Sequence, residues 1–309
     1  MKILLLGARG QLGWQLQRSL AVVGDVTALH RSSTPLCGDL GRPDGLAQSV
    51  RTLRPDVVVN AAAYTAVDRA EAEPGAAFAI NAAACEVLAR ESKAIGAWLV
   101  HYSTDYVFDG SGRRPWVETD ATGPINTYGR SKLEGERAVV AGTDRHLVFR
   151  CSWVFDTWGQ NFLKSILRAA AQRESLNVVG DQWGAPTRAA LIADVTAHAL
   201  RQLRPEQAGV YHLAAAGFTN WHAYAQLAVG EAIAQGVTLV TVPERVNAIG
   251  SSEYPVAAAR PGNSRLDTAR LRTAFGLSLP PWQDGVRAVV AELAAADRRS
   301  MEQGPKHVS

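Results

Sequence analysis

Cysteine is scarce in this sequence, and the three residues that occur stand far apart. Cys37, Cys85 and Cys151 form no CxxC pair and have no spacing typical of metal ligands. Three is also an odd number, which argues against a framework of disulfide bonds. The sequence therefore excludes a small disulfide-stabilised secreted domain, and we expect a protein of the reducing cytoplasm.

Long apolar runs and strong net charge are also missing. No stretch approaches the roughly 20 apolar residues that a membrane span needs. The apolar run Ile3–Leu6 stops at Gly7, which is too early for a signal peptide, so a buried strand is the better interpretation. The formal net charge is +3 without a basic run. We therefore expect neither a membrane nor a nucleic acid as a partner.

The sequence instead alternates short apolar runs with longer amphipathic ones. The expected strands are Ile3–Leu6, Val26–Leu29, Val57–Val59, Trp98–Tyr102 and His146–Arg150. The expected helices are Leu12–Val22, Leu46–Leu53, Ala76–Ile95 and Tyr128–Val140. This alternation predicts an α/β fold, a Rossmann-type doubly wound parallel sheet covered by helices on both faces. Strands that are apolar throughout agree with burial on both faces.

The second half of the chain is more mixed, and we expect a smaller C-terminal α/β domain there. Expected helices are Phe162–Ala171, Ala189–Leu203, Trp221–Ala234, Thr268–Phe275 and Gly285–Ala295, and expected strands are Val210–Leu213 and Leu239–Val242. The predicted division is a cofactor-binding domain over residues 1–152, to which residues 187–217 return, and a mainly substrate-binding domain over residues 153–309. The polar residues 297–309 are expected to be frayed.

A glycine-rich loop follows the first strand and precedes the first helix. Gly7, Gly10 and Gly13 form the pattern GxxGxxG. Glycine lets the backbone turn tightly and lets a pyrophosphate approach without a side chain in the way. The N–H groups at the start of the helix, at Gln11 and Leu12, can then bind the phosphates. A tight turn without a ligand is the alternative, but the position between strand and helix favours a nicotinamide dinucleotide.

Two further segments follow later strands at the edge where ligands of open α/β sheets bind. They are Asp39 and Leu40 after the second strand, and Ala62, Ala63, Tyr64 and Thr65 after the third. An acidic residue at the first segment can hold the adenine amino group, and small residues at the second let the chain run close to the cofactor. Each segment can equally be an ordinary capped loop.

Tyr128 and Lys132 are the candidate catalytic pair. Their i,i+4 spacing places both side chains on one face of the expected helix. Because a neighbouring ammonium favours the phenolate, we expect Lys132 to lower the Tyr128 pKa from its usual value near 10. The Thr104 hydroxyl, at the end of the fourth strand, can hydrogen-bond a substrate carbonyl oxygen. Hydride transfer to that carbonyl, with proton donation by Tyr128, would be a reduction, and Lys132 would also bind the nicotinamide ribose.

The end of the second strand predicts which dinucleotide is preferred. NAD-specific sheets place an acidic residue there for the ribose 2′-hydroxyl, whereas an arginine accommodates the 2′-phosphate of NADP. Here His30 takes the acidic position and Arg31 follows it. Arg31 can donate charge-assisted hydrogen bonds to the phosphate, and Arg9 can approach it from the other side. We expect NADPH to be preferred over NADH. If these are solvated loop residues, both cofactors would bind alike.

These motifs, taken in order, resemble the extended short-chain dehydrogenases and, among them, the dTDP-4-dehydrorhamnose reductase family. The segments that carry the resemblance are 7–13, 60–68, 102–108, 128–136, 150–155, 181–187 and 260–267, so it covers nearly the whole chain. The resemblance implies that Tyr128 and Lys132 are catalytic. It also implies a nucleotide-linked keto-sugar as substrate, reduced at its 4-keto group during synthesis of dTDP-rhamnose for cell-surface polysaccharide.

Further residues are expected at the substrate. They are Thr104, Asp105 and Tyr106 beside the sugar, Trp153 in the wall of the sugar pocket, Trp183 near the sugar or the base, and Arg260 at the diphosphate. The resemblance implies the sugar contacts. Trp183 is placed by the affinity of aromatic faces for sugars and bases, and Arg260 by the match between a guanidinium and a diphosphate.

A magnesium ion and a homodimer rest on the resemblance alone. Some members of the family hold Mg²⁺ with glutamates at a dimer interface. In this chain the segment after Thr187 reads Arg188-Ala189-Ala190-Leu191 and lacks a glutamate, so Glu292 is the one candidate ligand.

Other functions on the same fold are the alternatives. Dehydratases of this kind follow the Thr-Asp pair with a glutamate, whereas Tyr106 follows Asp105 here. The residues alone do not exclude an epimerase, which would not consume NAD(P)H during turnover. A non-catalytic regulator that binds nucleotide and a partner protein is a third alternative, but such proteins commonly lose the tyrosine or the lysine that this chain keeps.

Overall fold

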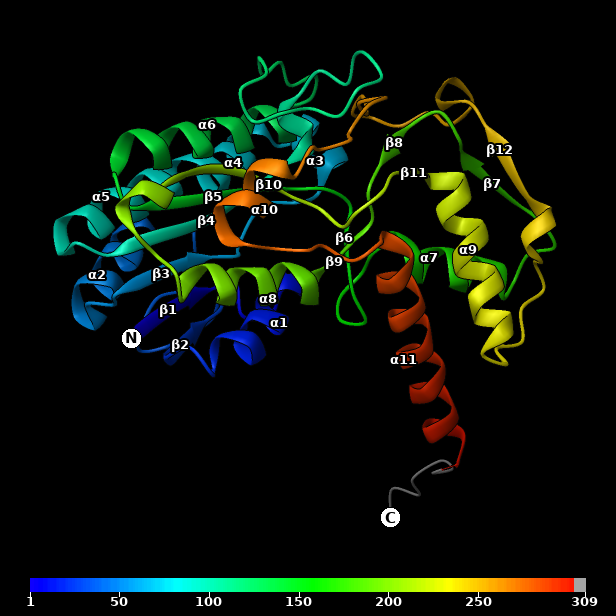
Figure 1. Cartoon of the computed structure of the whole chain (residues 1–309), viewed down its shortest axis with the longest axis horizontal. Helices are drawn as coiled ribbons and strands as arrows, with labels where there is room; N and C mark the ends of the chain where they lie inside the picture. The colour runs from blue at the N-terminus through cyan, green and yellow to red at the C-terminus, as the bar shows by residue number, and fades with distance from the viewer. Residues whose placement is uncertain (303–309) are drawn as a thin grey trace.

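A parallel sheet of six strands forms the centre of the molecule (Figure 1). The computed structural model describes residues 1–302. The strands are β1 (Lys2–Leu6), β2 (Asp25–Leu29), β3 (Val57–Asn60), β4 (Trp98–Thr104), β5 (His146–Cys151) and β10 (Gly209–Leu213). Their order across the sheet is β2-β1-β3-β4-β5-β10, and every pairing is parallel. The strand order reverses between β1 and β3, so the predicted α/β class with a doubly wound parallel sheet is confirmed.

Alternate residues of each strand face two different helix layers. Ile3 and Leu5 of β1 pack on the side of α1 (Gln11–Leu20) and α8 (Ala189–Leu200). Leu4 and Leu6 pack on the side of α2 (Pro43–Leu53), α5 (Ala84–Ile95) and α6 (Thr127–Gly142). Both sets of leucine and isoleucine side chains are buried, which explains why the strands read as continuous apolar runs. Truncating one such leucine to alanine would cost about 2–5 kcal/mol of stability.

A second group of elements lies at one end of the sheet, to the right in Figure 1. Its helices are α7 (Phe162–Ala170), α9 (Trp221–Ala234) and α11 (Trp282–Glu302), and its strand pairs are β6 (Val154–Phe155) with β9 (Thr187–Arg188), β7 (Leu176–Val179) with β12 (Val246–Ile249), and β8 (Trp183–Gly184) with β11 (Thr219–Asn220). Phe155, Tyr224, Trp282 and Val286 belong to its core. These elements therefore have a hydrophobic centre of their own beside the sheet.

Three short helices complete the described chain, namely α3 (Val67–Ala72), α4 (Pro74–Phe78) and α10 (Ala269–Phe275). The chain returns to the sheet between two segments that belong to the second group of elements. β9 leads into α8, which packs against α1, and β10 then forms the edge of the sheet beside β5. None of the described helices is long and apolar enough to cross a membrane.

Three segments differ from what the sequence patterns predict. The strand expected at Leu239–Val242 is irregular, because Val240 and Thr241 both donate their N–H groups to the Ala170 carbonyl instead of joining a ladder. The strand that pairs with β7 lies a few residues later, at Val246–Ile249. The frayed end expected from residue 297 is helical as far as Glu302, and residues 303–309 lie outside the described residues.

The helix expected at Ala76–Ile95 is the third difference. It is divided into α4, a π-helical stretch at Ala79–Ala83, and α5. Asn81 lies in the π-helical stretch, where its carbonyl passes so close to α6 that a Cβ on Gly135 would meet it at 1.8 Å. The Asn81 side chain also bonds the loop after β3. A π-bulge often marks a functional region, and this one lies behind the catalytic candidates.

Candidate active site

The carboxyl ends of the central strands bring the predicted site residues to one edge of the sheet. β1 leads into Gly7, β4 ends at Thr104, and β5 leads into Ser152. α6 begins at Thr127, since the Asn126 side chain accepts a hydrogen bond of 2.7 Å from the Gly129 N–H and caps the helix. The first turns of α6 therefore meet the end of β4.

The glycine loop forms a cradle that side chains would fill. Gly7 has a φ of +88°, and a Cβ there would meet the Ala62 backbone nitrogen at 2.6 Å. A Cβ on Gly13 would meet the Gly7 carbonyl oxygen at 2.0 Å, so the first turn of α1 lies directly against the loop. The opening N–H groups of the helix, including those of Gln11 and Leu12, have no partner within the helix. The loop thus fits the pyrophosphate of a dinucleotide.

The end of β2 brings Arg31 and Asp39 together. The Arg31 side chain is 87% exposed, and its Nε lies 3.6 Å from Asp39 Oδ2. Asp39 Oδ1 accepts a hydrogen bond from the Gly41 N–H. His30 Nδ1 accepts from the Ser32 N–H at 3.2 Å, which turns the imidazole toward its own loop. Arg31 is therefore an exposed cation paired with an acidic residue at the end of β2.

The remaining predicted cofactor residues differ in what they offer. Leu40 is buried in the core beside α2 and presents no polar group. Ala62 lies beside Gly7 and is partly exposed, whereas Ala63 and Thr65 are exposed. The Tyr64 hydroxyl donates to Glu73 at 2.8 Å. The side chain of Tyr64 is thus held by α3 and α4, while its backbone is fixed by Asn81.

Tyr128, Lys132 and Thr104 come together where α6 meets the end of β4. Lys132 is 2% exposed, and its Nζ donates to the Tyr102 carbonyl at 2.6 Å. The Thr104 hydroxyl donates to Asp105 Oδ1 at 2.9 Å, and its position beside the phenol opposes the rise that burial causes in the Tyr128 pKa. The Tyr106 ring meets the Tyr128 ring edge to face, with centroids 5.9 Å apart. The phenol is therefore oriented by groups from β4 and the turn that follows it.

The expectation that Lys132 lowers the Tyr128 pKa is wrong for this structure. Burial raises the pKa of the Tyr128 phenol, and the neighbouring Asp105 adds to the rise, while the hydrogen bond with Thr104 opposes it. Burial also lowers the pKa of Lys132, opposed by Cys85, Glu136 and Cys151. The lysine ammonium is turned toward the Tyr102 carbonyl instead of the phenol. Tyr128 therefore keeps its proton near neutral pH, as a proton donor must.

Asp105 is a buried carboxylate beside the catalytic candidates. It is 2% exposed, and its Oδ2 accepts from the Ser152 hydroxyl at 3.1 Å. Burial raises its pKa to about 6, and hydrogen bonds from Ser264, Thr104 and Ser152 hold it below a still higher value. Of these three hydroxyls, those of Thr104 and Ser152 meet ordinary hydrogen-bond geometry, and that of Ser264 does not. Asp105 therefore changes its charge close to physiological pH.

The aromatic residues expected at the substrate take different places. Trp153 has a φ of +47° and stacks on Trp221 with centroids 3.6 Å apart, while Gly184 packs against its other face. Trp183 is 38% exposed and carries the Arg265 guanidinium 4.7 Å from its ring centroid. Trp153 is thus fixed within the second group of elements, whereas Trp183 presents an accessible ring edge.

Arg260 is engaged inside the protein. Its Nη2 lies 2.7 Å from Asp68 Oδ2, and its Nη1 donates to the Ala258 carbonyl at 2.7 Å. Arg265 stands on Trp183 close to Arg113, whose charge adds to burial in lowering the Arg265 pKa. Arg113 was not singled out from the sequence, because only the fold brings it to Arg265.

Comparison with known proteins agrees with this geometry. The chain matches the RmlD substrate binding domain family over residues 1–295. It is 52% identical to the dTDP-4-dehydrorhamnose reductase of Salmonella typhimurium strain LT2, over 95% of this chain and 98% of the relative, and 50% identical to that of Escherichia coli K12, with the same coverage. The chain belongs to the dTDP-4-dehydrorhamnose reductase family.

A solved structure of the same family shares the fold. The crystal structure of dTDP-4-dehydrorhamnose reductase from Bacillus anthracis, in complex with NADP, superposes with a TM-score of 0.86. It is 32% identical and matches 94% of this chain and 99% of that one. The resemblance drawn from the motifs is therefore confirmed at the level of family and fold.

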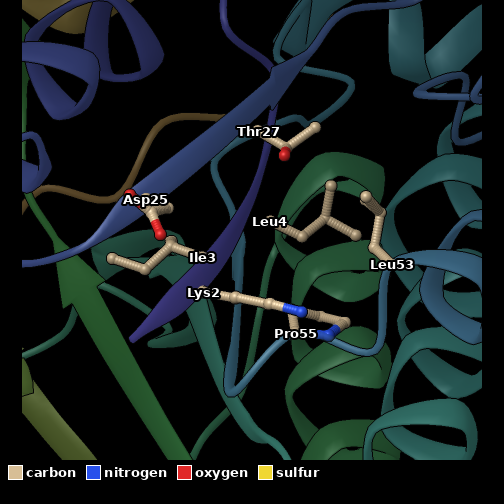
Figure 2. A pocket seen from close by; sticks show the side chains of 7 residues that line it. All are labelled: Lys2, Ile3, Leu4, Asp25, Thr27, Leu53 and Pro55. Atoms are coloured by element: carbon tan, nitrogen blue, oxygen red, sulfur yellow. The ribbon is translucent and has the colours of Figure 1, made fainter.

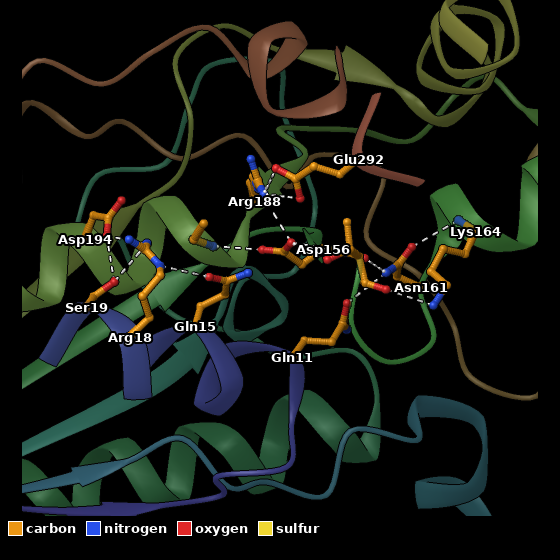
Figure 3. A network of polar contacts seen from close by, with 12 residues as sticks. Gln11, Gln15, Arg18, Ser19, Asp156, Asn161, Lys164, Arg188, Asp194 and Glu292 are labelled. Carbon is orange, nitrogen blue, oxygen red and sulfur yellow. Dashed lines mark hydrogen bonds and ion pairs between the residues drawn. The ribbon is translucent and has the colours of Figure 1, made fainter. Parts of the chain in front are cut away.

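The residues of this family member do not fit a magnesium site. Both carboxylate oxygens of Glu292 lie within 2.8 Å of Arg188 Nη2 (Figure 3). The Arg188 Nε also lies 3.5 Å from Asp156 Oδ1, so a guanidinium stands between the two carboxylates. Within residues 1–302, no group of three histidine, cysteine, aspartate or glutamate side chains is placed to hold a metal ion. Glu292, the one candidate ligand, is thus paired with a guanidinium within its own chain.

A hollow of about 220 Å³ lies at the opposite edge of the sheet and is separate from the candidate active site (Figure 2). It is lined by Lys2, Ile3, Leu4, Asp25, Thr27, Leu53 and Pro55. These residues include the amino ends of β1 and β2, away from the carboxyl ends where ligands of such sheets bind. We assign the chemistry to the carboxyl edge.

Proposed function

We propose that the protein reduces the 4-keto group of dTDP-4-dehydro-L-rhamnose to give dTDP-L-rhamnose, with NADPH as the hydride donor. The observation that carries the proposal is the geometry at the carboxyl end of β4, where Tyr128 lies against Tyr106 and Lys132, one turn further along α6, is held by the Tyr102 carbonyl. Membership of the reductase family supplies the substrate, since its relatives carry that name.

The protein's own groups then perform distinct tasks. The nicotinamide supplies the hydride when it is bound. Tyr128 donates its proton to the sugar oxygen as negative charge develops there, which is general acid catalysis. Thr104 lies beside the phenol, and because its one O–H is donated to Asp105 Oδ1, it must turn away from Asp105 before it can donate to the same oxygen. The Lys132 ammonium, fixed by the Tyr102 carbonyl, holds the nicotinamide ribose.

The preference for NADPH is a further part of the proposal. Arg31 is exposed at the end of β2, and no carboxylate occupies the position of His30. A charge-assisted hydrogen bond to the 2′-phosphate should favour NADPH by about ten- to a hundredfold. The test is kcat/KM for NADPH and for NADH in wild type and in Arg31→Ala. The variant should lose most of the NADPH advantage, while NADH turnover barely moves, and an unchanged ratio would exclude this role for Arg31.

The activity itself is tested with the purified protein, NADPH and dTDP-4-dehydro-L-rhamnose. NADPH absorbance should fall in proportion to the dTDP-L-rhamnose formed. UDP- and GDP-linked keto-sugars serve as controls, and reduction of only these would contradict the substrate assignment. Conversion of a sugar without loss of NADPH would favour an epimerase instead.

The proposal includes the organisation of the molecule. Residues 1–152, with residues 187–217, would bind the cofactor, and the remaining residues of 153–309 would bind the nucleotide sugar. The three free cysteines suit the reducing cytoplasm, where we place the reaction. A homodimer is the assembly that the resemblance implies, and sedimentation equilibrium of the purified protein measures it.

A further inference from the structure

His101 is a buried polar residue directly behind the lysine of the proposed site. It lies on β4, is 1% exposed, and its Nε2 stands 3.3 Å from Lys132 Nζ. The Tyr102 carbonyl, on the next residue of the same strand, accepts from Nζ at 2.6 Å. Two adjacent residues of β4 therefore hold the ammonium from the protein side.

The number of donors on Lys132 limits what these contacts can do. An ammonium carries three N–H groups and no acceptor. The Tyr102 carbonyl takes one and His101 Nε2 takes a second, so one N–H group is left for a ligand. Without the imidazole, a buried ammonium would keep a single protein acceptor and could turn about its last bond.

Two donors compete for the ring, because Lys132 Nζ faces Nε2 and the Asn60 amide nitrogen faces Nδ1 at 3.3 Å. A neutral imidazole accepts at one nitrogen only, and a hydrogen bond from an ammonium is stronger than one from an amide, so we expect Nε2 to be unprotonated and Nδ1 to carry the proton. Cys85 Sγ, 3.7 Å from Nδ1, is the weak acceptor on that side. Asn60 is the residue that pairs with His101 across β3 and β4. The ring is thus held between the two strands.

We propose that His101 is a positioning residue for Lys132: its Nε2 and the Tyr102 carbonyl bind two of the three N–H groups, so that the third is aimed at the cofactor ribose. This inference rests on the proposed function, since it assigns Lys132 the ribose. His101 touches neither substrate nor cofactor and acts only through the lysine.

The surroundings of Lys132 leave His101 as the neutral nitrogen acceptor. The ionisable groups that face the ammonium are Cys85 from α5, Cys151 from β5, His101 from β4 and Glu136 from its own helix. Burial raises the pKa of the Cys85 thiol to about 11 and that of Cys151 further still, so neither is a thiolate near neutral pH. Burial and the lysine charge lower the pKa of His101 well below its usual value, so the ring stays neutral.

The first experiment compares His101→Met with His101→Gln. The two side chains are similar in length and volume, but only glutamine offers a strong acceptor. In His101→Met we expect kcat/KM for the reduction to fall by about ten- to a hundredfold, the worth of a hydrogen bond to a charged group. The alkaline limb of the variant's kcat/KM–pH profile should move to lower pH, because the charged form of Lys132 loses an acceptor. NADPH affinity, measured by fluorescence, should also weaken. His101→Gln should restore most of the lost kcat/KM, of the shift in the pH profile and of the lost NADPH affinity.

The outcomes separate the inference from the proposed function. Equal losses in the two variants, or a methionine variant with the pH profile and NADPH affinity of wild type, would overturn the role of His101. A wild type that does not consume NADPH with the keto-sugar would contradict the proposed function, while the affinity comparison would still decide about His101.

A second measurement needs no variant of His101 to fold. Nitrogen-15 spectra of the histidine rings in wild type should show His101 neutral between pH 6 and 8, with its proton on Nδ1. In Lys132→Met, the Nε2 resonance should shift toward that of a free acceptor nitrogen. A proton on Nε2 in wild type, or a resonance indifferent to the lysine, would overturn the inference.

Discussion

The hydroxyl of Tyr128 is the atom on which the proposed reduction depends. Removing it in Tyr128→Phe should lower kcat by about 10²- to 10⁴-fold, the usual worth of a positioned acid. NADPH affinity should stay nearly constant, because Lys132 is held by β4 and not by the phenol. Lys132→Ala, as the matched comparison, should weaken both affinity and rate. Steady-state kinetics and NADPH titration measure the split, and near-normal turnover in Tyr128→Phe would refute the mechanism.

Asp105 makes a residue-scale prediction about stability and pH. Its pKa rises from 3.8 to about 6 on folding, so the folded protein binds this proton more tightly than the unfolded chain does. As the pH rises from about 4 to about 6, the unfolded chain ionises first and wild type loses stability. At about 1.4 kcal/mol per pKa unit, the cost above pH 6 is on the order of 3 kcal/mol.

Asp105→Asn should therefore gain stability relative to wild type over that pH window and keep the gain above it. Urea unfolding at several pH values between 4 and 8 measures the difference. Asp109→Asn is the control of opposite sign, because hydrogen bonds from Ser111 lower the Asp109 pKa below 3.8; its removal should cost stability that is already complete by about pH 5 and then stays constant. A stability difference between Asp105→Asn and wild type that does not change with pH would show that folding does not raise the Asp105 pKa. Asparagine keeps a single acceptor oxygen, so it can accept from Thr104 or from Ser152 but not from both, and the variant should also lose activity.

At the scale of elements, the loop at residues 156–161 is fastened to the glycine loop. The Trp158 indole N–H donates to the Arg9 carbonyl at 2.9 Å, and its ring stacks on Trp14 with centroids 4.4 Å apart. Asn161 donates to Gln11 Oε1 at 2.9 Å (Figure 3). These contacts join the proposed pyrophosphate cradle to the second group of elements.

Trp158→Ala should loosen this connection and speed the release of NADPH. The lost hydrogen bond and ring stacking together are worth about tenfold in affinity. Trp158→Phe keeps an aromatic ring for Trp14 but lacks the N–H donor, so its effect should be intermediate. Stopped-flow dissociation of NADPH, followed by its fluorescence, measures both variants. Dissociation of the alanine variant at the wild-type rate would show that the loop does not retain the cofactor.

The central elements could be predicted because their patterns are local. β1, β3, β4 and β5 are buried almost throughout, so each contains an apolar run that the sequence displays directly, whereas the edge strand β2 is only partly buried. The strand predicted at Leu239–Val242 is as apolar as these, yet Val240 and Thr241 find a partner at the end of α7. Hydrophobicity indicates that this segment is buried, but tertiary contacts determine its backbone conformation.

The candidate site shows the same limit. The spacing of Tyr128 and Lys132 on one helix was visible in the sequence, and so was the glycine loop between strand and helix. His101 and Lys132 are 31 residues apart, and Arg188 and Glu292 are 104 apart. A periodic sequence pattern does not predict contacts between residues so far apart in the chain. The direction of the Tyr128 pKa also depends on burial, which a sequence pattern does not measure.

At the scale of the whole molecule, a chain of polar contacts runs from the glycine loop to the last helix (Figure 3). Gln11 bonds Asn161, and Asn161 donates to the Asp156 carbonyl at 2.6 Å. The Asp156 carboxylate accepts from the N–H of Ala190 at the start of α8 and lies beside Arg188. Arg188 then bonds Glu292 on α11. The cofactor loop, α8 and α11 therefore share one framework of hydrogen bonds and ion pairs.

Glu292→Gln tests whether this framework depends on the ion pair or on a metal ion. The Arg188 side chain is 19% exposed, so loss of its charged partner should cost about 1 kcal/mol of unfolding free energy. Glu134→Gln is the matched control, because its pair with Arg137 is exposed on both sides and should contribute about 0.5 kcal/mol or less. Both variants are compared by urea unfolding.

The same measurement on wild type, with and without EDTA, separates the two explanations for how α11 is held. If the Arg188 guanidinium holds Glu292, chelation should leave unfolding and NADPH oxidation unchanged, whereas Glu292→Gln should lower stability with or without EDTA. A protein that is destabilised by EDTA and rescued by Mg²⁺ would show that a cation displaces Arg188 from Glu292. The ion pair would then be an alternative state of a metal site, and this framework would not be independent of magnesium.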